Sequence, residues 1–307
     1  MNLEKKPKVT VLLCTYNCEQ FILRSLKSIL WQDCQDFEVL ILDDASSDNT
    51  KSILAEIKDP RIKKIYFKQN RGQVHNLNFG TRIANGAYIS FLDVGDIWFP
   101  DFLSKMIGAT SDGTQFAYCW TAGQTRKPDL SVNNSYADFL YQGILADTIT
   151  LFISKEATKK IKFQSYSDGG YLKDDLFTLS AAKEYNVKLV PEELSVKLET
   201  SYDNGVNLSR NFSRCAGLAH EYYSDIKDDI WKHCGYIGLS RHNYLLCLKL
   251  LQGFQVTLFI KHFFLAISYY LLQFRTYKVY RRSISIYFII KSLTQNILIG
   301  INYKLKQ

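Results

Sequence analysis

Polar and aromatic side chains stand directly after three apolar runs in the first hundred residues, where folding could bring them together. They are, in chain order, Thr15, Tyr16, Asn17, Asp43, Asp44 and Asp93. An aromatic ring such as that of Tyr16 can stack on a planar base, and a carboxylate such as that of Asp44 can accept a hydrogen bond from a ring N–H. Carboxylate oxygens are also hard ligands for small divalent cations. These residue types therefore suit a ligand that joins a base to a hydroxylated and anionic remainder.

The segments around these residues alternate between short apolar runs and stretches with helical periodicity. Strands are expected over residues 9–15, 37–42, 62–67, 87–92 and 116–120, and helices over 21–30, 46–57, 73–84 and 100–107. Such alternation requires right-handed crossovers and gives an α/β fold with a mainly parallel central sheet. Because ligands bind outside the carboxyl ends of parallel strands, the polar residues are predicted to meet at one edge of the sheet.

The pattern is less regular between residues 121 and 200. The expected elements are a surface loop over 125–142, a strand over 149–154, a helix from Lys173 to Glu184, and a closing strand over 187–190 before Pro191. The first turn of this helix contains two adjacent carboxylates, Asp174 and Asp175. One reading of this pair is simply a charged helix N-terminus, which the helix dipole favours.

Five ordered motifs in this part of the chain resemble family 2 glycosyltransferases, which are inverting enzymes of the GT-A fold. The motifs are Val9–Asn17, Asp36–Thr50, Asn70-x-Gly72, Ala84–Tyr88 and Phe91–Pro100. The resemblance extends from about residue 8 to residue 200, and the five motifs together are far more specific than any one of them. It implies a nucleotide-diphospho-sugar transferase domain.

The resemblance implies a donor site for a nucleoside-diphosphate sugar of the UDP, GDP or dTDP type. The residues expected to bind it are Thr15, Tyr16, Asn17, Asp44, Gly72, Asn78 and Asp93. The alternative is that Tyr16 is a packed aromatic residue at a strand end and that Asp44 caps a helix. Leu77 stands where the family usually has arginine, so Arg71 or Arg82 is a candidate to replace that contact. Trp98 is expected to pack in the core rather than to stack on sugar.

The family binds Mg²⁺ or Mn²⁺ through an Asp-x-Asp element, and the metal stabilises charge on the leaving diphosphate. Here the element reads Asp93-Val94-Gly95-Asp96. Gly95 falls on the position that usually supplies the direct metal ligand. Asp93 and Asp96 are therefore the expected metal ligands, with the alternatives of a weakly held metal, no metal, or lost activity.

The resemblance also implies a catalytic base, because an inverting transfer needs a group that takes the proton of the acceptor hydroxyl. Asp174 is the expected base, and Asp175 is the alternative. This chain departs from the family's usual pattern around the base, with Lys173 in place of a frequent glutamate and Ser180 in place of an arginine. Both departures concern the subsite for the acceptor.

Bulk composition narrows the class of protein. With 307 residues, 47% of them hydrophobic, the chain can bury a sizeable core. Its seven cysteines contain no Cys-x-x-Cys pair, which argues against a disulfide framework or a structural zinc site and favours a reducing compartment. The charged start of the chain gives no indication of a secretory signal.

The net charge of +8 is unevenly distributed along the chain. After Asp229 there are eleven Lys or Arg and no acidic residue, whereas the first 229 residues hold 27 basic and 30 acidic residues. The expected division is a catalytic domain over 1–225 and a basic, apolar, helical region over 226–307. Helices that combine cations with aromatic residues lie at membrane surfaces and favour anionic lipid.

Alternatively, this C-terminal region packs on the catalytic domain or on a second subunit of a homo-oligomer. Nucleic-acid binding is not expected, because no recognition motif accompanies the charge. The sequence as a whole predicts sugar transfer to a glycan or lipid-linked acceptor in surface polysaccharide synthesis, at the cytoplasmic face of the membrane. The alternatives are a polyprenyl-phosphate sugar transferase and a non-catalytic binding subunit of the same fold.

Overall fold

The computed structural model describes part of the chain in detail. The described residues are 6–123, 136, 139, 146–164, 173–198, 224–225, 227–230, 232 and 260–268, without the side chains of 173 and 175. The chain divides into two compact units, one of Met1–Phe139 with Ile144–Asp203 and one of Leu140–Gly143 with Asn204–Gln307. The predicted loop over 125–142 lies almost wholly outside the described residues, as does most of the chain around the expected domain boundary at residue 225.

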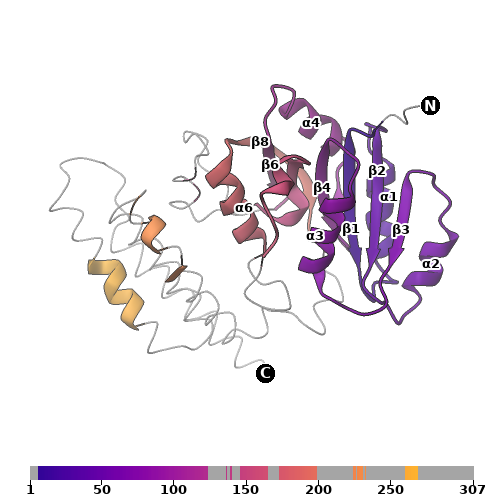
Figure 1. Cartoon of the computed structure of the whole chain (residues 1–307), viewed down its shortest axis with the longest axis horizontal. Coiled ribbons are helices and arrows are strands. Elements are labelled where there is room, and N and C mark those ends of the chain that lie inside the picture. Colours follow the sequence, from indigo (N-terminus) through magenta and orange to yellow (C-terminus); the bar gives the residue numbers. More distant parts are fainter. Residues whose placement is uncertain are drawn as a thin grey trace. The chain divides into compact units, whose positions relative to one another are not determined.

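The first unit contains the described strands and most of the described helices (Figure 1). Its elements are β1 (Val9–Thr15), α1 (Ile22–Leu30), β2 (Phe37–Asp43), α2 (Thr50–Glu56), β3 (Ile62–Tyr66), α3 (Gln73–Ile83), β4 (Tyr88–Asp93), β5 (Ile97–Trp98), α4 (Phe102–Ala109), β6 (Phe116–Thr121), the 3₁₀ turn η1 (Thr148–Thr150), β7 (Leu151–Ser154), the 3₁₀ turn η2 (Ala157–Lys159), α6 (Lys173–Glu184) and β8 (Val187–Val196). The strands and helices expected over the first 120 residues are confirmed, with ends that differ by a few residues.

The strands form one mixed sheet in the order β3-β2-β1-β4-β7-β6-β8-β5. Strands β3, β2, β1 and β4 are parallel to one another, and β7 joins antiparallel to both β4 and β6. Strand β8 is parallel to β6 and antiparallel to the short β5. The predicted α/β class is therefore confirmed, and the parallel half of the sheet is the half that the strand–helix alternation indicated.

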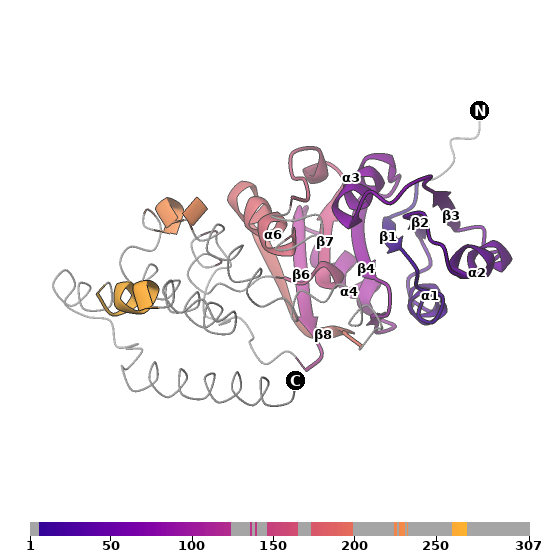
Figure 2. The same ribbon diagram turned by 90° about the horizontal axis from the view of Figure 1, so that it is seen from below.

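Helices cover both faces of the parallel half of the sheet, which explains why its inner strands are mostly apolar. In Figure 2, α1 and α2 lie on one side of β1 and β2, and α3 lies on the other. Helix α3 approaches closely at Gly80, where an added Cβ would lie 2.8 Å from Leu12 and 2.9 Å from Leu42. Alternate residues of β1 thus face opposite helices, as the period of a strand requires.

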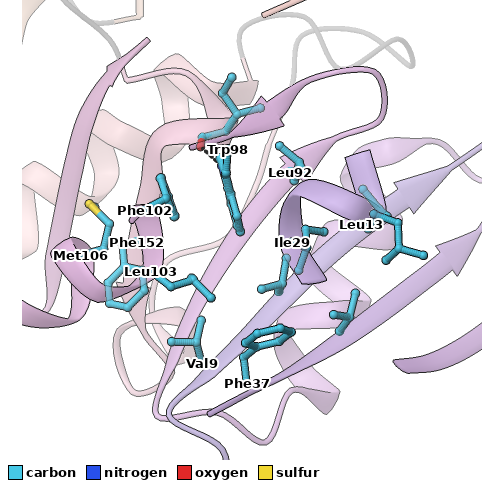
Figure 3. Close-up of a cluster of buried hydrophobic side chains, with 14 of the residues drawn as sticks. Val9, Leu13, Ile29, Phe37, Leu92, Trp98, Phe102, Leu103, Met106 and Phe152 are labelled. Atoms are coloured by element: carbon cyan, nitrogen blue, oxygen red, sulfur yellow. Dashed lines mark hydrogen bonds between the residues drawn. The ribbon is translucent and has the colours of Figure 1, made fainter. Parts of the chain in front are cut away.

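A buried cluster joins α1 and α4 to the sheet (Figure 3). Within it the indole of Trp98 stacks on Phe102, with ring centroids 4.1 Å apart and an interplanar angle of 7°. The indole N–H donates a hydrogen bond to the Ile149 carbonyl oxygen at 2.7 Å, so the polar atom of this ring is also satisfied. The expectation that Trp98 packs in the core is confirmed.

A buried carboxylate connects four segments at the amino end of the parallel strands. Glu38, only 5% exposed, accepts hydrogen bonds from the Thr10 hydroxyl at 2.8 Å and the Asn85 N–H at 2.7 Å. Lys63 of β3 forms an ion pair with it at 2.9 Å. Beside it the Gly86 N–H donates to the Thr10 hydroxyl at 2.8 Å, and any Cβ at Gly86 would lie 2.4 Å from the Thr10 nitrogen. This cluster therefore fixes the relative register of β1, β2 and β4.

The closing strand β8 is longer than the range 187–190 predicted from the sequence. Strand β8 does not end at Pro191 but continues to Val196, and it pairs with β5 through Val196 and Ile97. Its register with β6 shifts between Tyr118–Leu189 and Trp120–Glu193, so Pro191 lies in an irregularity of the ladder. A proline is tolerated there because no ladder hydrogen bond from its nitrogen is needed. The extension carries the chain on to Lys197 and Leu198.

The second unit contains one described helical stretch of several turns, residues 260–268. In it the side chains of Phe264 and Ile260 are exposed, whereas Ala266 and His262 are buried. Within the part of the chain that the structure describes, no helix is both long and apolar enough to span a bilayer. The rest of the predicted membrane-associating region lies almost wholly outside the described residues.

We expect Glu38→Gln to lower the free energy of unfolding by about 1–3 kcal/mol at pH 7, because an amide cannot accept hydrogen bonds from all of the donors that face the carboxylate. Burial alone raises the pKa of Glu38, but hydrogen bonds from Lys63, Asn85 and Thr10 outweigh it and lower the pKa overall. The stabilisation is thus present above the unfolded-state pKa and is lost as the pH falls through the folded-state value.

Urea unfolding of wild type and Glu38→Gln at pH 7 and at progressively lower pH measures this effect. The difference between the two proteins should shrink below about pH 4. Glu56→Gln, at an exposed position on α2, is the matched control and should change stability by less than about 0.5 kcal/mol at either pH. A difference at Glu38 that is independent of pH would contradict the assigned hydrogen bonding.

Candidate functional site

The register of the parallel strands aligns the residues at their carboxyl ends. Cys14 of β1 pairs with Asp93 of β4, and Thr15 pairs with Asp43 of β2. The backbone N–H of Asp44 donates to the Thr15 carbonyl oxygen at 2.8 Å, so the chain leaves both strands at the same point. Tyr16, Asp44 and Asp93 therefore follow adjacent strands at one edge of the sheet, and Tyr16 is partly exposed there.

Hydrogen bonds tie the loops after β1 and β2 to each other. The Asn17 side-chain oxygen accepts from the Ser47 N–H at 2.8 Å, and the Asn17 N–H donates to the Ser46 hydroxyl at 2.9 Å. Asn17 and Ala45 both have positive φ, at 45° and 63°. Asparagine tolerates this conformation but alanine does so at a cost, so the bonds hold a backbone shape that the chain would not adopt by itself.

Asp44 connects the end of β2 to the start of α3. Its two carboxylate oxygens accept hydrogen bonds from the backbone N–H groups of Arg71 and Gly72, each at 2.9 Å. Asp44 is 4% exposed, so these contacts are desolvated. A carboxylate has about four lone-pair sites, which leaves acceptor capacity for a donor on a ligand. Gly72 is the N-cap residue of α3, so Asp44 also anchors the start of that helix from a distant segment of the chain.

Asn78 is one of the residues expected to bind the donor, but its side chain forms hydrogen bonds to the backbone of a distant segment. Its amide nitrogen donates to the Phe163 carbonyl oxygen and its amide oxygen accepts from the Phe163 N–H, both at 2.9 Å. These reciprocal bonds hold the segment after η2 against α3. Leu77, where the resemblance anticipates arginine, is buried at 2% exposure and packs in the interior. We therefore assign Asn78 a structural role.

Hydrogen bonds connect the Asp93–Asp96 turn to α1. The Gly95 N–H donates to the Ser25 hydroxyl at 2.7 Å, and the Arg24 guanidinium donates to the Gly95 carbonyl oxygen at 2.7 Å. Gly95 has φ of 104°, a value that side-chain-bearing residues rarely adopt. The glycine at the usual ligand position is thus required by the shape of this turn.

The two carboxylates of this turn have different surroundings. Asp93, partly exposed, accepts a hydrogen bond from the Gln73 amide at 2.6 Å. Asp96 is 7% exposed and accepts from the Leu198 N–H at 3.1 Å. Burial, and next the negative charge of Asp93, raise the pKa of Asp96 to about 7. Asp96 is thus a buried carboxyl group next to a second carboxylate, and both effects favour its protonated form.

The predicted base, Asp174, is the second residue of α6 and is partly exposed. The Thr148 hydroxyl of η1 donates a hydrogen bond to its carboxylate. The side chain of the alternative base, Asp175, lies outside the described residues. Thr148 thereby fixes the orientation of one carboxylate at the start of α6.

Lys197 and Asp147 were not anticipated from the sequence. Their side chains form an ion pair at 2.6 Å, and the Thr121 hydroxyl donates to Asp147 at 3.4 Å. Burial lowers the pKa of Lys197, but the negative charges of Asp147, Asp93 and Asp174 outweigh it and raise the pKa. Lys197 thus interacts electrostatically both with Asp93, which is expected to bind the donor, and with Asp174, the expected base.

The carboxylates of Asp93 and Asp96 suit a divalent cation that takes only one or two of its ligands from the protein. Mg²⁺ is commonly held by one or two protein carboxylates and completes its shell with water and substrate phosphate oxygens. Burial, and next the negative charge of Asp93, raise the pKa of Asp96, and a cation beside the two carboxylates would favour their ionised forms. Among the described residues, no group of three or more His, Cys, Asp or Glu side chains converges as a self-sufficient metal site. A cation here would depend on the substrate's own oxygens.

Comparison with known proteins gives one family. Residues 10–170, more than half of the chain, match the family described as Glycosyl transferase family 2. The succinoglycan biosynthesis protein ExoO of Rhizobium meliloti (strain 1021) is 38% identical over 116 residues, which are 38% of this chain and 33% of that protein. The UDP-Glc:α-D-GlcNAc-diphosphoundecaprenol β-1,3-glucosyltransferase WfaP of Escherichia coli is 36% identical over 99 residues, 32% of this chain and 39% of that protein. The matched segments thus span well under two thirds of these relatives.

A solved structure extends the likeness of fold. The mannosyltransferase PcManGT from Pyrobaculum calidifontis, in complex with GDP-Man and Mn²⁺, superposes with a TM-score of 0.59 and 18% sequence identity. The match covers 97% of this chain and 81% of that one. The α/β fold is therefore of the GT-A type, and a neighbour of this fold binds a nucleotide sugar together with a divalent metal.

We expect Gly95→Ala and Gly95→Asp both to destabilise the chain, because each places a Cβ on a residue with positive φ. Strain of this kind costs about 1–3 kcal/mol, which corresponds to a fall in Tm of about 2–12 °C for a domain of this size. Thermal melts followed by circular dichroism measure the effect. The alanine variant controls for strain without a new carboxylate, and an aspartate variant that melts like wild type would contradict the conformational explanation.

Proposed function

This chain belongs to glycosyl transferase family 2, and we propose that it transfers a sugar, with inversion, from a nucleoside-diphosphate sugar to a hydroxyl group of a glycan or lipid-linked acceptor. The observation that carries this proposal is the strand register, which brings Tyr16, Asp44 and Asp93 to the carboxyl edge of the parallel strands, in a chain whose residues 10–170 match this family. An inverting transfer also needs a base, and we assign that role to Asp174, which accepts a hydrogen bond from the Thr148 hydroxyl.

The donor's base and ribose would lie on the loops after β1 and β2. Tyr16 offers an aromatic face and Asp44 offers remaining acceptor capacity for a ring N–H. Thr15, Asn17 and Gly72 line the same edge of the sheet through their backbone and side-chain positions. The nucleotide is proposed to be of the UDP, GDP or dTDP type.

The transfer itself requires one proton transfer and one displacement. Asp174 takes the proton from the acceptor hydroxyl as its oxygen attacks the anomeric carbon. The bond between that carbon and the diphosphate oxygen breaks, its electron pair stays with the diphosphate, and the nucleoside diphosphate leaves. The Thr148 hydroxyl orients the accepting carboxylate. Asp175 is the alternative base.

We further propose that Asp93 and Asp96 hold Mg²⁺ or Mn²⁺ together with the donor's phosphate oxygens. The metal would stabilise negative charge on the diphosphate. The protein's own part is to keep Asp93 oriented through Gln73 and to keep the turn fixed through Ser25 and Arg24.

The proposed setting is surface polysaccharide synthesis at the cytoplasmic face of the membrane. Support comes from the relatives, since one is named for succinoglycan biosynthesis and another for transfer to a diphosphoundecaprenol-linked sugar. The eleven cations after Asp229, without a single acidic residue, would favour an anionic lipid surface. Contact with a second subunit of a homo-oligomer is the alternative role of that region.

We expect calorimetric titration to detect binding of at least one of UDP, GDP and dTDP, more tightly with Mn²⁺ than without it. Asp174→Asn should retain that affinity but lower the rate of sugar transfer by at least about 100-fold, as loss of a general base does. The same substitution at Asp175 is the matched control and should leave most of the transfer. Transfer that persists in Asp174→Asn and is lost in Asp175→Asn would move the base by one position, whereas no nucleotide binding would overturn the proposed function.

We expect the full chain to float with vesicles that contain phosphatidylglycerol and not with vesicles of phosphatidylcholine alone. Flotation in a density gradient, at 0.1 M and 1 M salt, measures the interaction, which should weaken as salt screens the charges. Equal flotation with both lipids, or none with either, would argue against a basic membrane-binding region.

A further inference from the structure

We propose that the ammonium group of Lys197 binds the donor's diphosphate and stabilises the negative charge that develops on it as the sugar leaves. This inference rests on the proposed function, because it assumes a nucleoside-diphosphate donor. It assigns a substrate-binding residue that none of the sequence motifs contains.

The position of Lys197 follows from the extension of β8. Val196 pairs with Ile97, directly after the Asp93–Asp96 turn, and the Leu198 N–H donates to the Asp96 carboxylate at 3.1 Å. Lys197 lies between these two anchored residues, so its backbone is held beside the turn on both sides. Its side chain extends from that point to Asp147, with which it pairs at 2.6 Å.

The surroundings of Lys197 join the two halves of the proposed site. Asp147 and Thr148 are consecutive, and the first pairs with Lys197 while the second donates its hydroxyl to Asp174. Asp93 and Asp174 both act on Lys197 electrostatically. Asp147 and Thr148 thus connect Lys197 to the proposed base, so the ammonium group is assigned to the part of the site where the bond between the sugar and the diphosphate breaks.

The charge balance also favours a role toward an anion. Four carboxylates, those of Asp93, Asp96, Asp147 and Asp174, act on one another or on Lys197. A diphosphate would be repelled unless positive charge faced it. The Lys197 side chain is half exposed, at 50%, and lysine is a compact point charge on a flexible stem. It can therefore turn from Asp147 to a phosphate oxygen without unfolding the strand.

The competing possibility is a purely structural ion pair, in which Lys197 only fixes the end of β8 to Asp147. The two roles predict opposite results at Asp147. If the pair is structural, removing either charge has the same consequence. If Lys197 serves the diphosphate, loss of the Asp147 charge frees the ammonium and removes a repelling anion, so affinity is kept or increased.

The experiment compares Lys197→Met, Lys197→Arg and Asp147→Asn with wild type in the full chain. Affinities for UDP, GDP and dTDP are measured by calorimetry with and without Mn²⁺, and those for the corresponding nucleosides by ligand-observed NMR. Lys197→Met should weaken diphosphate binding by about 10- to 100-fold, the range expected for a charge-assisted hydrogen bond. Nucleoside binding should be unchanged, Lys197→Arg should largely restore diphosphate binding, and Asp147→Asn should bind at least as tightly as wild type.

The remaining outcomes have distinct meanings, with thermal melts showing that the variants are folded. Unchanged diphosphate affinity in Lys197→Met overturns the inference and leaves the proposed function intact. Equal losses in Lys197→Met and Asp147→Asn overturn it in favour of the structural pair, as does a parallel loss of nucleoside affinity. If wild type binds none of the three nucleotides, the proposed function itself fails and this inference fails with it.

Discussion

The interactions of Glu38, a residue of β2, fix how the four parallel strands are aligned, and the geometry of the site depends on that alignment. Thr10, Asn85 and Lys63 all address this one buried carboxylate, from β1, from the loop before β4 and from β3. A slip of one residue in any of these strands would turn its side chains to the other face of the sheet. The alignment at the amino edge therefore determines that Thr15 lies beside Asp43, and Cys14 beside Asp93, at the carboxyl edge.

At that carboxyl edge the dominant physical feature is an excess of negative charge. Burial, and next the negative charge of Asp93, raise the pKa of Asp96, and Asp147 adds to this effect. The folded state would be more stable with fewer carboxylates here, since burying a charge without a full partner is unfavourable. Residues that weaken a fold in this way are candidates for function. Here the carboxylates are explained if they hold a divalent cation that binds together with the diphosphate and if Lys197 adds positive charge beside it.

The parallel half of the fold could be predicted from the sequence because its apolar runs and helical stripes are local patterns. The strand ends, and with them Tyr16, Asp44 and Asp93, follow from the same patterns. Lys197 could not be found this way, since Pro191 reads as the end of a strand and only the irregular pairing with β6 lets β8 continue. The reciprocal bonds between Asn78 and Phe163 join residues that are 85 positions apart, a contact that no local pattern signals.

The interlocked loops after β1 and β2 have a consequence for selectivity. Asn17 and Ala45 have a left-handed backbone, and the bonds from Asn17 to Ser46 and Ser47 connect the two loops in which they lie. Loops connected in this way are preorganised before a ligand binds, so little conformational entropy is lost on binding. The same connection limits adaptation, because neither loop can change its conformation without breaking its hydrogen bonds to the other. Evolution toward a different nucleobase would therefore require coordinated replacement of both loops rather than drift at single positions.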